Sequence, residues 1–349
     1  MKRRPLFLLA LLALAAVGLL FQPVRVSGPS MAPTLLDGEV RLTRPLWLGA
    51  PERDDLVVFR EPDTEQVAVK RVAGLPGERI RLAGGDLFID GRRRRREVSG
   101  LADLVPLVDA APAAIPEEFH LPPEDEEPAA RPPADGFLHA AGRAFLRAVP
   151  LDGWLGPDGL VLGSRPAADL GVAADFELLA PDSRLELLLV EGSSTFALAA
   201  GGGACVLSRD GAELARAPLP PGFRRGRLFL AKVDRRLTAR LDGRELFPPV
   251  SYTPATAVPL ADGLEGPPFE QAGFGGRQVL LRRIGVGRDI FREATGTWAC
   301  SRELQLKEDE YFLLGDHPDA SRDSRHYGPV SRERLLGVVG PRLWGGTGG

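Results

Sequence analysis

The pattern of apolar and polar residues divides the chain into an N-terminal apolar run and many short segments typical of β-strands. Residues 6–21 contain no charged residue and follow the basic residues Lys2, Arg3 and Arg4. A membrane-spanning helix needs about 20 apolar residues, so the length of this run suits either a short anchor or a cleaved export signal. We favour the anchor, because the alanines that could form a cleavage site lie inside the run, at residues 13–16.

The basic residues before the run predict its orientation. Lysine and arginine next to a spanning segment stay preferentially on the cytoplasmic side, so the rest of the chain is expected outside the cytoplasm. We therefore predict one crossing of the cell inner (plasma) membrane, with the folded part on the extracytoplasmic, periplasmic side.

The remaining chain is predicted to be mainly β. Apolar runs between residues 23 and 97 are short and alternate with polar residues, and Asp-Gly and Gly-Gly pairs separate them, as in hairpins. The expected strands lie at residues 40–42, 55–59, 66–69, 79–82 and 86–90. A strand, a polar loop and a second strand return at residues 311–339, so this domain is expected in two parts.

A second set of longer predicted strands interrupts the first domain. Residues 98–135 are rich in proline, alanine and acidic residues without periodicity and predict a linker. The regular strand spacing that follows favours an inserted β-sandwich, whose pattern between Phe176 and Phe247 resembles laminin-G or concanavalin-like domains. The expected segments are an anchor at 1–22, a first domain part at 23–97, the linker at 98–135, the sandwich at 136–294 and a second domain part at 295–349.

Composition narrows the classes of function. A net charge of -3 and a pI near 5.9 argue against a nucleic-acid surface. The run of five arginines at residues 92–96 is interpreted as a solvated hairpin end, with contact to anionic lipid headgroups as the alternative. Cys205 and Cys300 are the only cysteines and lack metal-ligand spacing, so no metal is expected; whether they form a disulfide stays open.

Ser30 and Lys70 are the candidate reactive pair. A serine hydroxyl needs a base to accept its proton during attack, and two of the four histidines, His120 and His139, lie in or near the predicted linker. Lysine can act as that base where burial removes its charge, and Lys70 lies in the apolar run 67–72. An exposed lysine at a strand edge is the alternative when Lys70 is considered alone.

Four motifs occur in order behind the apolar run, at residues 27–35 (SGPSMAPTL), 55–59 (DLVVF), 69–77 (VKRVAGLPG) and 315–325 (GDHPDASRDSR). Together they resemble the ordered motifs of bacterial type I signal peptidases, which are membrane-anchored endopeptidases with a Ser-Lys dyad. The resemblance covers about residues 1–91 and 311–340 and implies a signal-peptidase-type β catalytic core.

The resemblance also implies a role for each matching residue. Ser30 corresponds to the nucleophile and Lys70 to the general base. Ser321 matches a serine that hydrogen-bonds the lysine, Asp323 and Arg325 match an ion pair of the loop, and Asp316 and Arg71 are expected to form another.

Other parts of the expected site depart from the family pattern or lie around the dyad. The backbone amide of Ser30 is one candidate oxyanion donor. Gly28 occupies the position where some members have a serine that supplies the second donor, so a backbone or water donor is expected there instead. His317 and Pro318 also depart from the family, and His317 and His326 are interpreted as loop or surface residues. Pro33 is expected to hold Ser30 in a rigid turn. The residues considered for an apolar rim at the substrate and the membrane are Met31, Pro33, Leu35 and Trp47, with core packing preferred for Leu35.

The resulting hypothesis is a membrane-bound serine endopeptidase without a cofactor. Its expected partners are the signal peptides of exported preproteins and the lipid bilayer, but no nucleic acid. For the inserted sandwich two alternatives stay open: it binds a glycan or protein ligand, or it is an inert spacer. Two alternatives are a catalytically silent adhesion or carbohydrate-binding protein and a self-cleaving Ser-Lys regulator.

Overall fold

The computed structural model forms two compact units, and each is described by itself. Unit 1 comprises residues 1–94 and 291–349, and unit 2 comprises residues 95–290. The structure describes residues 21–32, 34–83, 85–95, 97–111, 115–120, 136–139, 142–147, 154–155, 161–162, 169–254, 258–259, 265–266, 270–289, 295–317 and 320–344.

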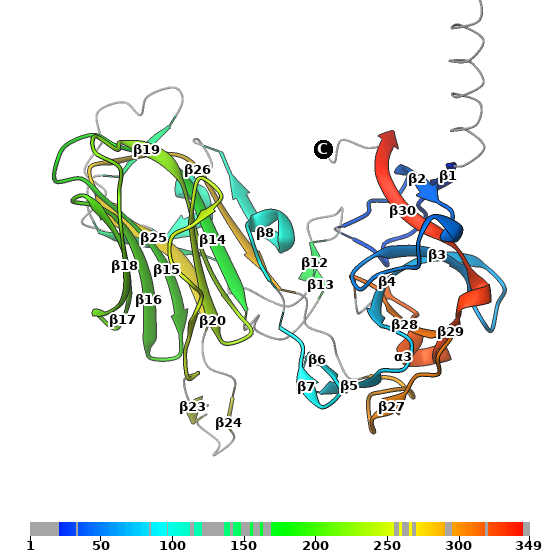
Figure 1. Ribbon diagram of the computed structural model, residues 1–349. Coiled ribbons are helices and arrows are strands. Elements are labelled where there is room, and N and C mark those ends of the chain that lie inside the picture. The colour runs from blue at the N-terminus through cyan, green and yellow to red at the C-terminus, as the bar shows by residue number, and fades with distance from the viewer. Residues whose placement is uncertain are drawn as a thin grey trace, which may run out of the picture. The chain divides into compact units, whose positions relative to one another are not determined.

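Unit 1 is built on an antiparallel seven-stranded sheet (Figure 1). Its strands come from both ends of the chain, and the central pairing of β3 with β4 places Val57 opposite Lys70. The order across the sheet is β1 (Gln22–Arg25), β2 (Val40–Arg44), β30 (Leu335–Trp344), β3 (Leu56–Arg60), β4 (Val67–Gly74), β28 (Glu310–Leu314) and β29 (Val330–Ser331).

A smaller four-stranded sheet completes unit 1. It has the order β27 (Leu304–Gln305), β5 (Arg79–Ala83), β6 (Asp86–Ile89) and β7 (Arg92–Arg93). Buried apolar side chains from β4, β5 and β28 meet between the two sheets, including Ala73, Ile80 and Phe312. Short helical turns connect the strands: η1 (Leu46–Leu48), α3 (Ser324–Tyr327) and η5 (Arg332–Arg334).

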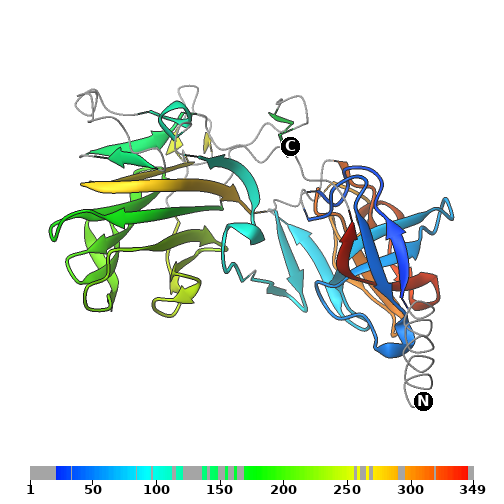
Figure 2. The same ribbon diagram turned by 90° about the horizontal axis from the view of Figure 1, so that it is seen from above.

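Two antiparallel sheets form a β-sandwich in unit 2, and their strands run side by side in Figure 2. One sheet has the order β10 (Phe137–His139), β26 (Val279–Arg288), β14 (Leu170–Leu178), β19 (Arg225–Val233), β20 (Arg236–Leu241) and β21 (Arg244–Glu245), with β22 (Val250–Ser251) on β20 and β8 (Val105–Ala110) on β26. The other has the order β18 (Ala212–Pro218), β17 (Ala204–Arg209), β16 (Ser194–Gly201), β15 (Arg184–Glu191), β25 (Glu270–Arg277), β11 (Arg143–Leu146) and β9 (Phe119–His120).

The core of unit 2 follows from the alternation of its strands. Leu185, Leu187 and Leu189 of β15 point inward and pack with Leu228 and Leu230 of β19 in one buried cluster. Removal of this apolar surface from water is the main driving force for closing the two sheets. Two isolated hairpins also belong to this unit: β12 (Trp154–Leu155) with β13 (Val161–Leu162), and β23 (Val258–Pro259) with β24 (Glu265–Gly266).

The structure differs from the expected linker at residues 98–135. Within that range, β8 pairs with β26, β9 pairs with β11, and α2 (Ile115–Glu118) lies between them. Ahead of β8, Val98 and Leu104 are buried beside η2 (Leu101–Asp103) against apolar side chains on the outer face of the sandwich. Sequence reasoning missed this strap (residues 98–104) because its few apolar residues show no periodicity.

The predicted anchor at residues 6–21 lies, apart from Phe21, outside the described residues. Among the helices that the structure describes, none is long and apolar enough to cross a bilayer. Cys205 and Cys300 are both free thiols. Cys205 is buried in unit 2, and Cys300 is partly buried in unit 1. Two residues of the arginine run form ion pairs, Arg93 with Asp86 and Arg94 with Asp54.

Candidate active site

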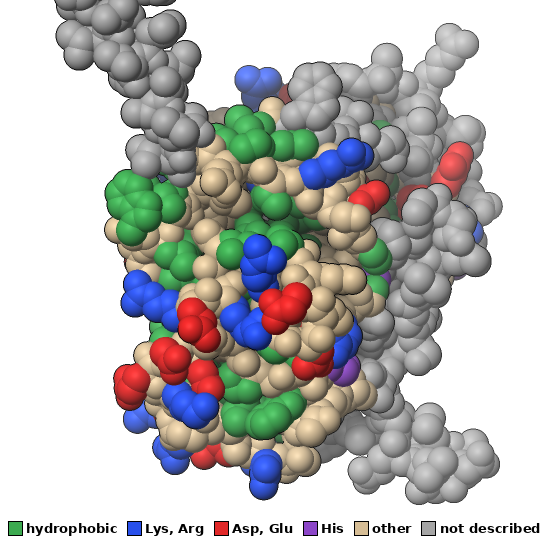
Figure 3. All heavy atoms as spheres, turned by 90° about the vertical axis from the view of Figure 1, so that its right-hand side faces the viewer, with side chains coloured by type: hydrophobic (Ala, Val, Ile, Leu, Met, Phe, Trp, Pro, Cys, Tyr) green, Lys and Arg blue, Asp and Glu red, His purple; other side chains and the backbone are tan. Residues whose placement is uncertain are grey.

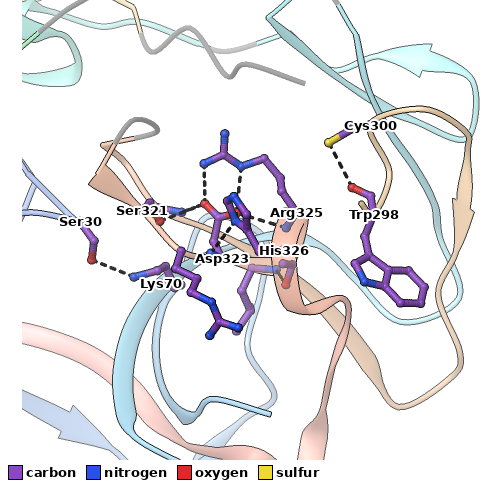
Figure 4. A network of polar contacts seen from close by, with 12 residues as sticks. Ser30, Lys70, Trp298, Cys300, Ser321, Asp323, Arg325 and His326 are labelled. Atoms are coloured by element: carbon purple, nitrogen blue, oxygen red, sulfur yellow. Dashed lines mark hydrogen bonds and ion pairs between the residues drawn. The ribbon is translucent and has the colours of Figure 1, made fainter. Parts of the chain in front are cut away.

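Ser30 and Lys70 lie together, as Figure 4 shows. The Lys70 Nζ donates a hydrogen bond to the Ser30 Oγ at 2.8 Å, and it lies 3.1 Å from the carbonyl oxygen of Val69. Forty residues separate the two in the chain, so the contact depends on the fold of unit 1. The distance is within the range for proton transfer between a hydroxyl and a base.

Lys70 is set up to lose its proton more easily than a lysine in water. Its side chain projects from the middle of β4 and only 4% of the residue is exposed. Burial lowers the pKa of Lys70 because it disfavours the charged ammonium, while the carboxylates of Asp323, Glu61 and Asp316 partly oppose this effect. A neutral amine is therefore more accessible near neutral pH than for an exposed lysine.

Buried apolar side chains hold the turn that carries Ser30. Met31 and Leu35 are each 1% exposed and form a cluster with Val26, against which Leu56 and Val69 pack. The expectation that Met31 contributes to an exposed rim is therefore wrong, since its side chain is buried in this apolar cluster. Core packing of Leu35 is confirmed, and Pro33 lies outside the described residues.

Gly28 has a local role in the same turn. Its φ of +84° is a conformation that glycine adopts readily, and its amide donates to Asp37 Oδ1 at 2.9 Å. The Gly28 amide is therefore already engaged with a carboxylate. No described residue accepts a hydrogen bond from the Ser30 amide.

The polar loop after β28 packs directly on the Ser30 turn. The amide of His317 donates to the carbonyl oxygen of Ser30 at 3.1 Å. A Cβ at Gly315 would lie 2.0 Å from the Ser321 Oγ and 2.8 Å from the Ser30 carbonyl oxygen. Only glycine allows the loop and the turn to approach this closely.

Asp323 organises this loop from a fully buried position. Its carboxylate accepts hydrogen bonds from the Gly315 amide at 3.0 Å and the Ser321 hydroxyl at 3.0 Å. It also forms a buried ion pair with the Arg325 guanidinium at 2.9 Å and caps α3 by accepting from the Arg325 amide. The predicted pairing of Asp323 with Arg325 is thus present.

Ser321 lies beside the Ser30 turn but has a different partner from the expected one. Its hydroxyl donates to Asp323, and no hydrogen bond joins it to Lys70 among the described residues. The buried carboxylate is a stronger acceptor than a neutral amine, which explains the choice. Ser321 therefore contacts Asp323, and through it the rest of the loop, rather than Lys70.

The second expected ion pair, between Arg71 and Asp316, is also present. The Arg71 Nε donates to Asp316 Oδ1 at 2.8 Å, and a second guanidinium nitrogen contacts the other oxygen. Because Arg71 follows Lys70 on β4 and Asp316 follows Gly315, this pair joins the strand to the polar loop.

Glu61 and Arg322 form a third pair that the sequence did not reveal. Glu61 is 9% exposed and follows β3 directly. Neither residue stands out in the sequence, because charged residues at strand ends and in polar loops are ordinarily solvated.

No histidine side chain that the structure describes bonds the Ser30 hydroxyl. His317 is buried, which contradicts its interpretation as a surface residue but agrees with a place in the loop. The Nδ1 of His326, a residue on α3, accepts from the Asp323 amide at 3.3 Å. Within the described part of the chain, no three His, Cys, Asp or Glu side chains group as metal ligands.

Comparison with known proteins places unit 1 in a family. The family model described as signal peptidase, peptidase S26, matches residues 3–104 and 286–344, which is nearly all of unit 1. Unit 1 belongs to the signal peptidase family. The resemblance to bacterial type I signal peptidases drawn from the sequence is thereby confirmed.

Individual relatives agree with the family match. Signal peptidase I of Streptococcus pneumoniae TIGR4 is 42% identical over 88 residues, which cover 25% of this chain and 41% of that protein. Signal peptidase I of Bacillus amyloliquefaciens is 37% identical over 84 residues, covering 24% of this chain and 44% of that protein. The chain thus spans less than half the length of these signal peptidases.

A solved structure of a galectin is also similar to part of the chain. The galectin LEC-6 of Caenorhabditis elegans is 13% identical and covers 44% of this chain and 96% of that one, with a TM-score of 0.27. Similarity at this level carries no inference about fold or ligand.

Proposed function

We propose that the chain is a membrane-bound signal peptidase that cleaves signal peptides from exported preproteins with a Ser30-Lys70 dyad. The observation that carries the proposal is the 2.8 Å contact between the Ser30 hydroxyl and the buried Lys70 amine. The family of unit 1 supports the reaction class.

The dyad performs acyl transfer in two stages. Neutral Lys70 accepts the Ser30 proton while the Ser30 oxygen attacks the carbonyl carbon of the scissile peptide, which gives a tetrahedral intermediate with a charged oxygen. The Ser30 amide donates to that oxygen. Lys70 then passes the proton to the leaving amine, and an acyl-enzyme ester remains on Ser30.

Water completes the cycle. Lys70, neutral again, takes a proton from the attacking water, and the collapse of the second intermediate returns a proton to Ser30 and releases the carboxylate product. The carboxylates that act on Lys70, those of Asp323, Glu61 and Asp316, stay paired with arginines throughout and do not exchange protons.

Contact with the bilayer is the second part of the proposal. Residues 6–21 form the anchor, and exposed apolar side chains support a membrane-facing surface of unit 1. Trp47 is 69% exposed and its neighbour Leu48 is 49% exposed. Figure 3 shows that apolar side chains gather in patches on one face of unit 1, next to charged ones.

The test compares variants on a preprotein with alanine before the cut, in detergent solution. We expect cleavage by the wild type and a loss of at least about 10⁴-fold for Ser30→Ala and for Lys70→Met, because each removes one half of the proton transfer. Ser301→Ala and Lys307→Met, at exposed positions, serve as matched controls with rates near wild type.

Thermal unfolding shows whether each variant is folded. Undiminished cutting by a folded Ser30→Ala or Lys70→Met variant contradicts the dyad. The alternatives of a silent adhesion protein and a self-cleaving regulator have no observation among the described residues that favours them.

A further inference from the structure

Arg322 points away from the buried residues on either side of it. Ser321 and Asp323 are 7% and 0% exposed and face the dyad, whereas the Arg322 guanidinium forms ion pairs with Glu61 and Asp63. It also lies over the ring of Tyr327, 5.7 Å from the ring centre. Arg322 thus joins the polar loop to the turn that follows β3.

The Glu61 carboxylate is held in a defined place under this arginine. The backbone of Glu61 closes the β3–β4 turn, because its amide donates to the carbonyl oxygen of Gln66 at 2.9 Å and its carbonyl oxygen accepts from the Glu65 amide at 3.0 Å. The Thr64 hydroxyl donates to the carboxylate. With 12% of its side chain exposed, this charge is poorly screened by water and acts on nearby groups.

Lys70 lies within the field of three carboxylates, those of Asp316 and Asp323 in the polar loop and that of Glu61 in the β3–β4 turn. Each carboxylate has an arginine of its own: Asp323 is paired with Arg325, Asp316 with Arg71 and Glu61 with Arg322. The arginine side chains differ in exposure, at 2% for Arg325, 21% for Arg71 and 48% for Arg322. The Glu61 pair is therefore the one that a single surface substitution can open without removing a buried charge.

We propose that Arg322 is a positioning residue that fixes the polar loop on the β3–β4 turn and masks the Glu61 carboxylate from the Lys70 amine. The inference rests on the proposed function, in which neutral Lys70 is the base. An unmasked Glu61 favours the ammonium form of Lys70, and a missing Glu61 favours the amine.

The two partners are therefore expected to change the pH dependence of cleavage in opposite directions. Arg322→Met leaves Glu61 unpaired, so the acidic limb of kcat/KM moves to higher pH by about half a unit, which is about a threefold loss of rate on that limb. Glu61→Gln moves the limb to lower pH by a similar amount. The double variant, which removes both charges, returns close to the wild-type profile.

Arg334→Met is the matched control. Arg334 also pairs with a glutamate of the β3–β4 turn, Glu65, but that glutamate is 62% exposed and does not act on Lys70. In this variant, the acidic limb of the kcat/KM profile is expected at the same pH as in the wild type. Loss of loop packing alone would lower kcat in both test variants without moving the limb in opposite directions.

A second readout observes Lys70 without turnover. The chain has four lysines, so ¹³C-labelled lysine gives few side-chain NMR signals, and Lys70→Met identifies the one of interest. We expect its titration midpoint to rise in Arg322→Met and to fall in Glu61→Gln. Midpoints that stay at the wild-type value in both variants overturn the inference, whether or not the protein cleaves. A wild type that cleaves no preprotein contradicts the proposed function instead. In that case the Lys70 titration still shows whether Arg322 masks the Glu61 carboxylate.

Discussion

At the scale of single residues, the candidate site depends on groups that are buried and shared. One carboxylate, Asp323, accepts from the Gly315 amide, the Ser321 hydroxyl and the Arg325 side chain. Satisfying a buried charge with several donors fixes its position, and removing any one donor leaves a costly unpaired group. The loop is therefore rigid where it contacts the Ser30 turn.

Gly315→Ala tests how tightly the loop and the turn are packed. The added Cβ would overlap with the Ser321 Oγ and approach the Ser30 carbonyl oxygen, so one of the two segments must move. We expect kcat/KM to fall by about 100-fold, because a shift of about 1 Å at the nucleophile is enough for such a loss. Steady-state cleavage of a preprotein measures the effect.

Gly100→Ala is the control for the glycine substitution. Nothing lies within 4 Å of a Cβ at Gly100, and its φ of 178° suits any residue. This variant is expected to keep full activity. Wild-type turnover by Gly315→Ala would mean that the close approach of Ser321 to Ser30 is not required.

At the scale of elements, the strands could be predicted from the sequence better than the contacts between them. The expected strands at residues 55–59 and 79–82 lie within one residue of β3 and β5, because alternation and turn residues are local signals. The pairing of Glu61 with Arg322 joins residues that are 261 positions apart, and such contacts leave no periodic pattern. The partner of Ser321 was missed for a similar reason, since a hydroxyl can donate to any nearby acceptor.

The strap on the sandwich shows the same limit and gives a testable consequence. Leu104 is 4% exposed, and Gly171 and Gly287 leave room for its side chain. Leu104→Ala is expected to destabilise unit 2 by about 2–4 kcal/mol, because it leaves a cavity under the strap. Cys205, fully buried in unit 2, reports opening through its rate of labelling by a thiol reagent, which should rise about 30-fold or more.

Leu214→Ala provides the comparison for the strap. Leu214 is 39% exposed on β18, so its removal is expected to change Cys205 labelling less than about threefold. Equal labelling rates for Leu104→Ala and the wild type would show that the strap does not stabilise the sandwich.

At the scale of the whole molecule, the two units differ in how their buried charges are balanced. In unit 1 each carboxylate near Lys70 has an arginine, whereas in unit 2 two buried carboxylates share one lysine. The Lys232 ammonium contacts Glu191 and Glu270, each at 2.7 Å, and the Tyr252 hydroxyl donates to Glu191. Burial raises the pKa of Glu270 to about 8 and that of Asp169, which accepts from the Asp234 amide, to about 7.

This imbalance predicts that unit 2 loses stability as the pH rises. Both groups have folded-state pKa values above their ordinary ones, so between about pH 4 and 8 the folded state holds protons that the unfolded chain has released. The free energy of unfolding should therefore fall on the order of 4 kcal/mol between pH 6 and 8.5 and level off above that. Urea unfolding measures this fall, with pulse labelling of Cys205 normalised to the unfolded chain at each pH.

Glu270→Gln separates this cause from a general effect of pH. The amide cannot ionise, and Lys232 keeps its pair with Glu191, so most of the pH dependence above pH 6 should disappear. Glu213→Gln, on an exposed glutamate of β18, should keep the wild-type dependence. If the free energy of unfolding of Glu270→Gln falls with pH as steeply as that of the wild type, the carboxylates that share Lys232 do not cause the pH dependence. The proton taken up on folding is then held by another group of unit 2.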